Sequence, residues 1–512
     1  MAIKIALLIV FFGIMIIVGL RSRKHATNVN DFVLGGRSVG PWLTAFAFGT
    51  SYFSSVVFIG YAGKFGWDFG LASTWIGLGN ALIGSLLAWL VLGRRTRVMT
   101  NHLQAATMPE FFGKRYESKA IKITASIIVF IFLIPYTASI YNGLSRLFGM
   151  AFDIPYEVCV IVMATLTAVY VILGGYMATA INDFIQGIIM LGGIAGVIIA
   201  VLNGKGGFIE AIKSLSLFPS EVPATLGQQG AYSSFFGPDP VNLISVIILT
   251  SLGTWGLPQM VHKFYTIKDE KSIQTGTIIS TIFAIVVAGG SYFLGGFSRL
   301  FDGDAIRVVA ADGTSKVVYD TIVPHMLSSL PDILVGITVV LVLSASMSTL
   351  SSLVLTSSST LTLDFLKETC MKKITAKTQL RIMRILIAVF VAISVILALD
   401  PPKFIAELMG ISWSALAGSF LAPFLYGLYW KGVTKPAVWA SFAVGVGVTV
   451  SNLYLNFMSS SIVAGAFTML LSLIVVPVVS IITPKMSKAS LLDIFSCYTE
   501  TVIVSKKDSL EE

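Results

Sequence analysis

The sequence predicts an all-α polytopic membrane protein with about thirteen transmembrane helices, and three observations lead to this fold class. The chain of 512 residues is 55% hydrophobic and only 12% charged, about half the charged fraction of a soluble domain. Apolar segments of about 20 residues, the length that spans a bilayer, recur along the chain. Lys and Arg concentrate in every second connection between them. This composition excludes a soluble enzyme, a nucleic-acid binder and a disulfide scaffold.

The expected helices follow from these apolar segments in chain order. They lie at about residues 4–20, 41–63, 73–93, 120–147, 155–173, 182–202, 241–261, 274–297, 332–362, 382–399, 405–429, 436–455 and 462–482. We expect the first segment to be retained rather than cleaved as a signal peptide, because its basic cluster follows the apolar run.

The basic residues predict how these helices are oriented. With the N-terminus outside and the C-terminus in the cytoplasm, the inward-facing connections hold most of the 35 Lys and Arg residues, as the positive-inside rule requires. The net charge of +9 then faces the cytoplasm and anionic lipid. We therefore expect a multi-pass protein of the plasma (cytoplasmic) membrane, with the bilayer as its partner, no nucleic acid and no evident obligate protein partner.

Two of the apolar segments contain helix-breaking residues. The second reads AFAFGTSYFSSVVFIG and includes Gly49, and the seventh reads LTSLGTWGLPQMVHKF and includes Gly253, Gly256 and Pro258. Interruptions inside a membrane persist where they line a cavity or a site. The two segments lie five spans apart, and an odd displacement reverses the direction of crossing, which indicates an inverted repeat with its binding site at the breaks. The alternative is that Gly and Pro are simply frequent in membrane helices.

The repeat divides the chain into six parts. We expect a first helix with a cytoplasmic link, the first repeat, an external loop, the second repeat, two final helices and a cytoplasmic tail. Their bounds are 1–38, 39–202, 203–240, 241–429, 430–484 and 485–512.

The segment at 332–362 carries an unusual number of hydroxyl side chains. Ser348, Ser351 and Ser352 have the spacing of one helix face, and Thr349 lies about 100° round from Ser348. Hydroxyls and freed backbone carbonyls supply the hard oxygen ligands that a sodium ion prefers. The alternative is that each hydroxyl bonds to the carbonyl four residues earlier in its own helix, or serves close helix packing.

Asp183 is a carboxylate at the start of the segment at 182–202. Carboxylates inside a membrane are costly and usually functional. Its alternative role is an N-cap or a first-turn acid at the membrane interface.

Five stretches together resemble the sodium:solute symporter family. They are NDFVLGGRSVGPWLTAFAFGTSYFSS, ATMPEFFGKRYES, GGYMATAINDFIQG, SASMSTLSSLVLTSSSTLTLDFLK and YWKGVTKPA. The resemblance implies a leucine-transporter-type 5+5 inverted-repeat core and no catalytic residues.

The resemblance also implies where sodium binds. One sodium site would use the backbone carbonyls of Thr50, Phe53 and Ala345 with the hydroxyls of Ser348 and Thr349. It permits a second sodium nearer the cytoplasm, held by Asp183, Ser348, Ser351 and Ser352.

The resemblance constrains the solute less closely. Proline-type members carry an Asp where this chain has Tyr52, and the chain looks closer to pantothenate-type members. We expect a small polar organic solute, such as an organic acid, a vitamin like pantothenate or an amino acid. It would contact Ser54, Ser55, Tyr136, Trp255 and Gln259, and the amide ends of the broken helices would hold a carboxylate.

These observations predict a sodium-coupled secondary active symporter that imports its solute by alternating access. The alternatives are an ion channel, and a proton-coupled or facilitative carrier on the same fold. A channel requires a filter sequence that the chain does not show, and hydroxyl side chains do not titrate as proton coupling requires.

Overall fold

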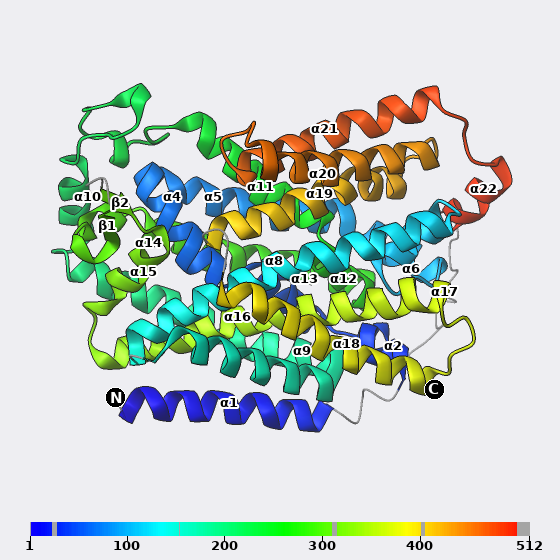
Figure 1. Cartoon of the computed structure of the whole chain (residues 1–512), viewed down its shortest axis with the longest axis horizontal. Helices are drawn as coiled ribbons and strands as arrows, with labels where there is room; N and C mark the ends of the chain where they lie inside the picture. The colour runs from blue at the N-terminus through cyan, green and yellow to red at the C-terminus, as the bar shows by residue number, and fades with distance from the viewer. Residues whose placement is uncertain (1, 23–27, 153, 310–314, 401–404, 499–512) are drawn as a thin grey trace, which may run out of the picture.

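The computed structural model describes residues 2–22, 28–152, 154–309, 315–400 and 405–498. Long helices run side by side along one direction, and a small antiparallel hairpin lies at one end of the bundle (Figure 1). The predicted tail at 485–512 is described only to residue 498, and its remaining residues lie outside the described part of the chain.

The elements of the first half are short near the breaks and long elsewhere. They are α1 (Ala2–Ser22), α2 (Val29–Leu34), η2 (Gly35–Arg37), α3 (Pro41–Tyr52), η3 (Val56–Tyr61), α4 (Ala62–Phe69), η4 (Gly70–Ser73), α5 (Thr74–Gly79), η5 (Asn80–Leu87), η6 (Trp89–Gly93), α6 (Arg94–His102), α7 (Met108–Arg115), α8 (Lys119–Phe152) and α9 (Tyr156–Asn203).

The second half repeats this alternation and adds three C-terminal helices. Its elements are α10 (Phe208–Ser216), η7 (Pro223–Thr225), η8 (Ala231–Ser233), α11 (Pro240–Gly256), α12 (Pro258–Thr266), α13 (Glu270–Ala284), η9 (Ile285–Gly289), α14 (Gly290–Gly295), η10 (Ser298–Phe301), η11 (Asp304–Ile306), β1 (Arg307–Val309), β2 (Ser315–Val317), α15 (Tyr319–Ser328), α16 (Asp332–Thr360), η12 (Leu361–Leu366), α17 (Lys367–Thr369), α18 (Ala376–Leu399), α19 (Ile405–Tyr429), α20 (Lys435–Leu455), α21 (Ser461–Ile482) and α22 (Lys488–Ser496).

The expected number of helices, about thirteen, is not confirmed. Within the described residues, ten helices are long and apolar enough to cross a membrane, or eleven when the bent pair α11–α12 counts as one span. Two expected spans, 155–173 and 182–202, lie in the single element α9, which changes direction at Gly175 with φ 56° and ψ −151°. The part of α9 before that point is a shorter apolar helix.

Both predicted interruptions are present, and they have nearly the same backbone geometry. The first span breaks after α3, where Phe53 has φ −87° and ψ 123°. The second breaks between α11 and α12, where Leu257 has φ −83° and ψ 121°, and the two helices meet at 46°. Pro258 is the first residue of α12, a position where its missing N–H costs no hydrogen bond.

The glycines expected to break these spans have a different role. Gly49 lies inside α3 and Gly253 inside α11, so the breaks follow them by about one turn. An added Cβ at Gly49 would collide with the Phe283 ring, and one at Gly253 would lie 2.6 Å from Trp413 Cε3. Gly256 ends α11 against α19, where a Cβ would lie 2.8 Å from Ala417 Cα. These glycines therefore permit close packing, and the extended residues after them form the breaks.

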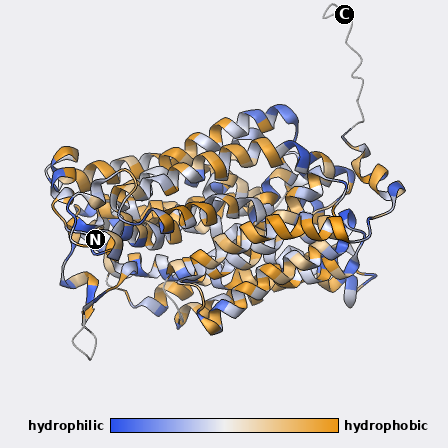
Figure 2. Cartoon of the chain, turned by 90° about the horizontal axis from the view of Figure 1, so that it is seen from above, coloured by the Kyte–Doolittle hydropathy of each residue, from blue (hydrophilic) through white to orange (hydrophobic). Residues whose placement is uncertain are grey.

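The centre of the bundle is formed by α16 and α19. The apolar part of α19 is 94% buried in protein and that of α16 is 78% buried, whereas the value for α1 is 17%. Hydrophobic residues occupy the middle of the helices, and hydrophilic residues gather towards both ends (Figure 2). The bilayer thus meets the peripheral helices, and the polar residues of α16 face protein.

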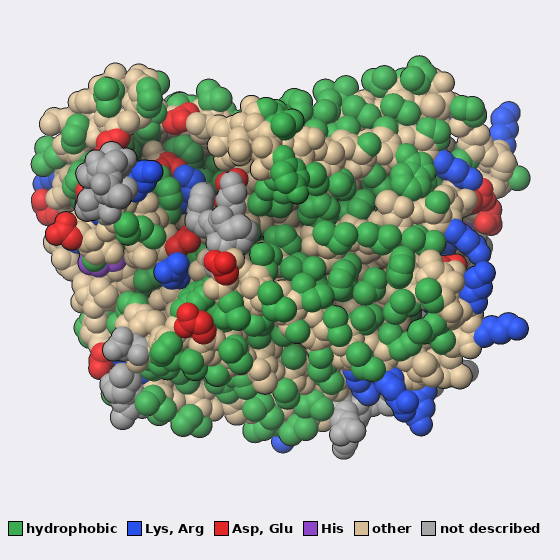
Figure 3. Space-filling view, viewed as in Figure 1, with side chains coloured by type: hydrophobic (Ala, Val, Ile, Leu, Met, Phe, Trp, Pro, Cys, Tyr) green, Lys and Arg blue, Asp and Glu red, His purple; other side chains and the backbone are tan. Residues whose placement is uncertain are grey.

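Lys and Arg side chains gather at one end of the bundle. Figure 3 shows them at the end where α6, α17 and α22 lie in Figure 1, and the start of α1 lies at the opposite end. This separation is the pattern that the sequence predicts, and it places the start of α1 away from the basic face.

Candidate functional site

The first candidate site lies where the break after α3 meets α16. The Thr349 hydroxyl oxygen is 3.2 Å from each of three backbone carbonyl oxygens, those of Thr50, Phe53 and Ala345. Ser348 donates a hydrogen bond of 2.7 Å to the Thr50 hydroxyl. All five residues are buried. The structure therefore brings together the complete set that the sequence assigned to a first sodium ion.

The oxygen atoms that converge on Thr349, the Thr349 cage, form a set of candidate ligands for a cation. A hydroxyl carries one proton and can satisfy one acceptor at a time, yet three carbonyl oxygens converge on this one. The carbonyl of Thr50 is free for this contact because α3 ends at Tyr52, and the last carbonyls of a helix have no partner within it. Oxygen atoms without fixed charge, brought from two elements, suit a hard monovalent cation.

The second predicted set is only partly assembled. Ser352 on α16 lies 2.8 Å from the Ser51 hydroxyl and accepts a hydrogen bond of 3.0 Å from Lys263 Nζ. Lys263 Nζ is 3.8 Å from the Asp183 carboxylate. The Ser351 hydroxyl instead donates to the Ser348 carbonyl of its own helix, at 2.8 Å. Ser351 therefore bonds within its own helix, to the carbonyl three residues earlier. The bond to the carbonyl four residues earlier, which was the alternative, is present for Thr349 with Ala345.

The helix-start role for Asp183 is wrong. Asp183 lies inside α9, past the change of direction at Gly175, and is fully buried, so it neither caps a helix nor lies in a first turn. Its partner Lys263 lies inside α12 and is 1% exposed. Sequence reasoning missed this pair, although a lysine five residues after the helix-breaking Pro258 was a signal for an intramembrane charge.

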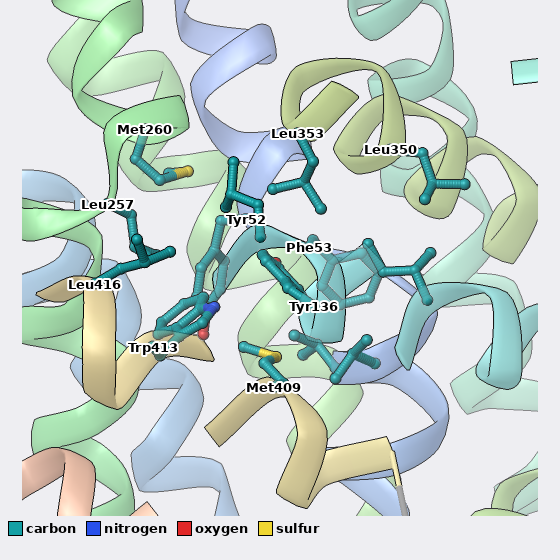
Figure 4. Packing of buried hydrophobic residues seen from close by; sticks show 14 of the residues in the cluster. Tyr52, Phe53, Tyr136, Leu257, Met260, Leu350, Leu353, Met409, Trp413 and Leu416 are labelled. Atoms are coloured by element: carbon teal, nitrogen blue, oxygen red, sulfur yellow. The ribbon is translucent and has the colours of Figure 1, made fainter. Parts of the chain in front are cut away.

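The predicted solute residues divide into two groups. Tyr136 on α8 joins Tyr52 and Trp413 in an aromatic cluster, with ring centroids 5.9 Å apart for Tyr52–Trp413 and 6.0 Å for Tyr136–Trp413. Figure 4 shows these three side chains facing one another, with Met409 and Leu416 beside them. Tyr52 and Trp413 were not assigned to the site from the sequence, because an aromatic residue in a membrane helix is usually packing.

Ser54 and Ser55 follow the extended residue Phe53 and lead into the next helix. Both are fully buried. The Ser55 N–H donates to Ser346 Oγ at 3.0 Å, and its hydroxyl donates to the Ile140 carbonyl at 2.9 Å. Ser55 therefore holds the extended segment against α16 and α8. Ser54 Oγ accepts from the Val56 N–H at 3.2 Å, which starts the next helix.

Trp255 and Gln259 flank the second break. The Trp255 indole N–H donates to the Ile83 carbonyl on η5 at 3.0 Å, so the structure does not bring it to the aromatic cluster. Both side-chain polar atoms of Gln259 are buried, and neither has a hydrogen-bond partner among the described residues. An unpartnered buried amide is costly, which makes Gln259 a group that a bound solute can satisfy.

Hydrogen bonds close the molecule between the site and the basic end. Arg37 donates to the Ala105 carbonyl at 2.6 Å and to the Tyr265 carbonyl at 3.3 Å, and Val39 pairs with Ile267 in a short bridge. Burial, followed by repulsion from Arg97, lowers the pKa of Arg37 to about 10, which leaves it a cation at neutral pH.

The opposite end is more open. A cavity of about 410 Å³ lies there, lined by residues of α4 and by the starts of α11 and α21. Beside Tyr52 and Phe53 the remaining space is only about 10 Å³, room for about one water molecule. The site is therefore closed towards the basic end and lies beneath a cavity at the other end.

Comparisons with known proteins agree with this architecture. The model of the sodium:solute symporter family matches residues 32–445. The osmoregulated proline transporter OpuE of Bacillus subtilis is 28% identical over 488 residues, covering 94% of this chain and 95% of that protein. A sodium/proline symporter of Staphylococcus aureus is 31% identical over 457 residues, covering 86% of this chain and 84% of that protein.

Solved structures support the same fold. The substrate-bound outward-open state of a Na⁺-coupled sialic acid symporter matches with a TM-score of 0.75 and 15% identity, covering 95% of this chain and 99% of that chain. The inward-facing conformation of Mhp1 matches with a TM-score of 0.52 and 13% identity, covering 89% and 94%. At such identities the likeness concerns the fold, which is the leucine-transporter-type inverted repeat.

The two sequence relatives are named for proline, whereas the sequence looked closer to pantothenate-type members. Both are transporters, so this chain is a transporter and not an enzyme. The chain belongs to the sodium:solute symporter family, and sodium-coupled symport is its activity.

Proposed function

We propose that the protein imports a small amino acid or organic acid together with sodium, by alternating access. The observation that carries the proposal is the convergence of three carbonyl oxygens on the Thr349 hydroxyl. Sodium bound there would take all three carbonyl oxygens and the Thr349 hydroxyl oxygen as ligands, and the hydroxyl would keep its proton. The names of the relatives make proline the first solute to test.

Sodium would act by joining two elements that alternating access moves apart. Thr50 and Phe53 belong to the break after α3, and Ser348 and Thr349 belong to α16. An ion that binds only when the two are together favours the state in which the break is fixed, because a ligand shifts populations through its differential affinity. One charge crossing about 100 mV provides about 2.3 kcal/mol, enough for about fiftyfold accumulation.

The solute would bind between the two breaks. The N-terminus of α12 carries the partial positive charge of a helix start, and the unpartnered amide of Gln259 lies in its first turn. These groups suit a carboxylate without an Arg. The rings of Tyr52, Tyr136 and Trp413 suit the hydrocarbon part of a small solute. Ser54 completes the proposed set, whereas Ser55 and Trp255 hold the two breaks in place.

The test is solute uptake into proteoliposomes at fixed voltage, with sodium replaced by choline. Proline, pantothenate and small monocarboxylates are compared in parallel. We expect one of them to accumulate only with sodium. Accumulation that is unchanged in choline, or driven by a proton gradient instead, contradicts the proposal, and single-channel currents would favour the channel.

The proposed orientation places the start of α1 outside and the basic end in the cytoplasm. Cys370, which follows α17 at the basic end, is exposed. In intact cells a membrane-impermeant thiol reagent should leave Cys370 unlabelled, and permeabilisation should expose it, while the Cys370→Ser variant reports background labelling. Labelling of Cys370 in intact cells would reverse the orientation.

A further inference from the structure

Lys263 places a positive charge among the oxygens that the family resemblance offered to a second sodium. Its ammonium donates to Ser352 Oγ at 3.0 Å and lies 3.8 Å from the Asp183 carboxylate. Ser51 Oγ lies 2.8 Å from the same Ser352 oxygen. The ammonium also lies over the Tyr176 ring, 5.2 Å from its centroid. Lys263 is 1% exposed and Asp183 is fully buried.

The same helix face supplies the oxygens of both clusters. Ser348 belongs to the Thr349 cage through Thr50 and also lies beside the Asp183 carboxylate. Ser352, one turn along α16, is the member that Lys263 contacts. Lys263 therefore occupies the position of a cation and not that of a ligand.

The charges argue against a sodium ion at this second cluster. The Lys263 ammonium already neutralises the Asp183 carboxylate and contacts the Ser352 oxygen. A sodium ion among these groups would lie beside a second cation, and like charges at such distances inside a protein repel each other strongly. The Thr349 cage consists of neutral oxygens and contains no ammonium, so a cation there meets no such competitor.

We propose that the Lys263 ammonium takes the place of a second sodium ion, so that a single sodium ion, bound at the Thr349 cage, accompanies each solute. The inference rests on the sodium-coupled symport proposed above and fixes its stoichiometry. It also predicts that the charge of the side chain at position 263 determines whether one or two sodium ions bind. With a neutral side chain there, the Asp183 carboxylate and the hydroxyls of Ser352 and Ser51 become available to a second sodium.

The test measures the sodium-to-solute ratio in proteoliposomes. At a series of opposed sodium and solute gradients and a fixed voltage, the gradient that gives zero net solute flux reports the ratio directly. We expect one sodium per solute for the wild type and for Lys263→Arg, which keeps the charge. Lys263→Met, of similar length and no charge, should need two, and the Hill coefficient for sodium should rise from about 1 to about 2.

A double variant identifies the new ligand. Lys263→Met with Asp183→Asn removes both charges, and its ratio should return to one because the second sodium has lost its carboxylate. A ratio of two in this double variant would contradict the assignment of Asp183, and a ratio of one in Lys263→Met alone would overturn the proposal.

The wild type alone also decides the matter, should Lys263→Met fail to fold. A wild-type ratio of one supports the inference, and a ratio of two overturns it. Uptake by the wild type that does not depend on sodium at all would instead refute the proposed function, so the two failures are distinct.

Discussion

The two hydroxyl clusters on α16 lie about one turn apart and differ in what faces them. Thr349 faces the broken end of α3, which presents backbone carbonyls and no charge. Ser352 faces α12, which presents the Lys263 ammonium paired with Asp183. Equivalent alcohols thus belong to the proposed sodium cage in one place and contact a buried ion pair in the other. The opposing element, and not the hydroxyl helix, decides which of the two results.

This difference has an energetic consequence. A neutral cage can release its ion without leaving a buried charge behind, as a transport cycle requires. The Asp183–Lys263 pair cannot lose either member without a large penalty. We therefore expect substitutions in the pair to affect stability first, and substitutions in the cage to affect sodium affinity first.

The largest expected effect is that of Asp183→Asn. It leaves the Lys263 ammonium buried without a carboxylate, which should cost about 3–5 kcal/mol of folding free energy. Thermal unfolding of the purified protein should show a marked fall in Tm, and adding Lys263→Met should restore most of it. A single variant as stable as the wild type would break the comparison, since the pair would then contribute nothing to stability.

Removal of the cage hydroxyls should come next. Ser348→Ala with Thr349→Val keeps the shape of α16 but deletes two ligand oxygens, each of which contributes about 1.4 kcal/mol. The sodium concentration for half-maximal uptake should rise about a hundredfold, with little change in Tm.

The matched control for this variant is Ser358→Ala on the same helix. Its hydroxyl donates to the Leu355 carbonyl at 3.1 Å and belongs to neither cluster. If this control shifted sodium dependence as much as the cage variant does, the assignment of the cage would fail.

A smaller effect is expected from Gly253→Ala. The new methyl group would lie 2.6 Å from Trp413 Cε3, and accommodating it should cost about 1–3 kcal/mol. Because Trp413 belongs to the aromatic cluster, the KM for solute should rise about tenfold, while the apparent affinity for sodium stays near the wild-type value. Gly192→Ala, where nothing lies within 4 Å of the added Cβ, should be silent; equal effects of the two variants would argue against the close approach of Trp413.

The smallest effects distinguish the two tryptophans. Trp413→Phe should weaken solute binding by about threefold to tenfold, as expected for the loss of one aromatic contact. Trp255→Phe should leave solute binding unchanged and cost about 1 kcal/mol of stability through the lost bond to Ile83. Equilibrium binding of labelled solute measures the first, and thermal unfolding measures the second. The opposite pattern would return Trp255 to the solute site, as the sequence predicted.

Much of the fold could be predicted from local composition, because a membrane-spanning segment must be apolar and must satisfy its own backbone hydrogen bonds. The apolar segments, the paired breaks near Phe53 and Leu257 and the separation of basic residues all follow from the cost of polar groups in hydrocarbon. The number of spans is not confirmed, because the structure divides the apolar segments differently. The expected span at 155–173 contains only a shorter apolar helix, and residues 56–102, which include parts of two expected spans, form one long helical stretch. The six-part division of the chain stays a prediction.

Part of the candidate site could be predicted, namely the residues that the family resemblance supplied. The five residues of the first cage came from a resemblance that already carries three-dimensional information, and the structure assembles all five. Trp413 and Lys263 could not be found in this way. The role of each side chain depends on which residues of other helices it contacts.

The sequence by itself determined that this protein spans a membrane, that the first span of each expected repeat is interrupted, and that one central helix is rich in hydroxyls. Those properties depend on residue type and spacing, which the linear chain contains. Only the tertiary structure decided that Ser351 bonds within its own helix, that the glycines serve packing, and that the Lys263 ammonium lies beside Asp183 and Ser352. The physical reason is that hydrogen bonds and charge pairs form between groups from different helices, and their partners are set by how the helices pack.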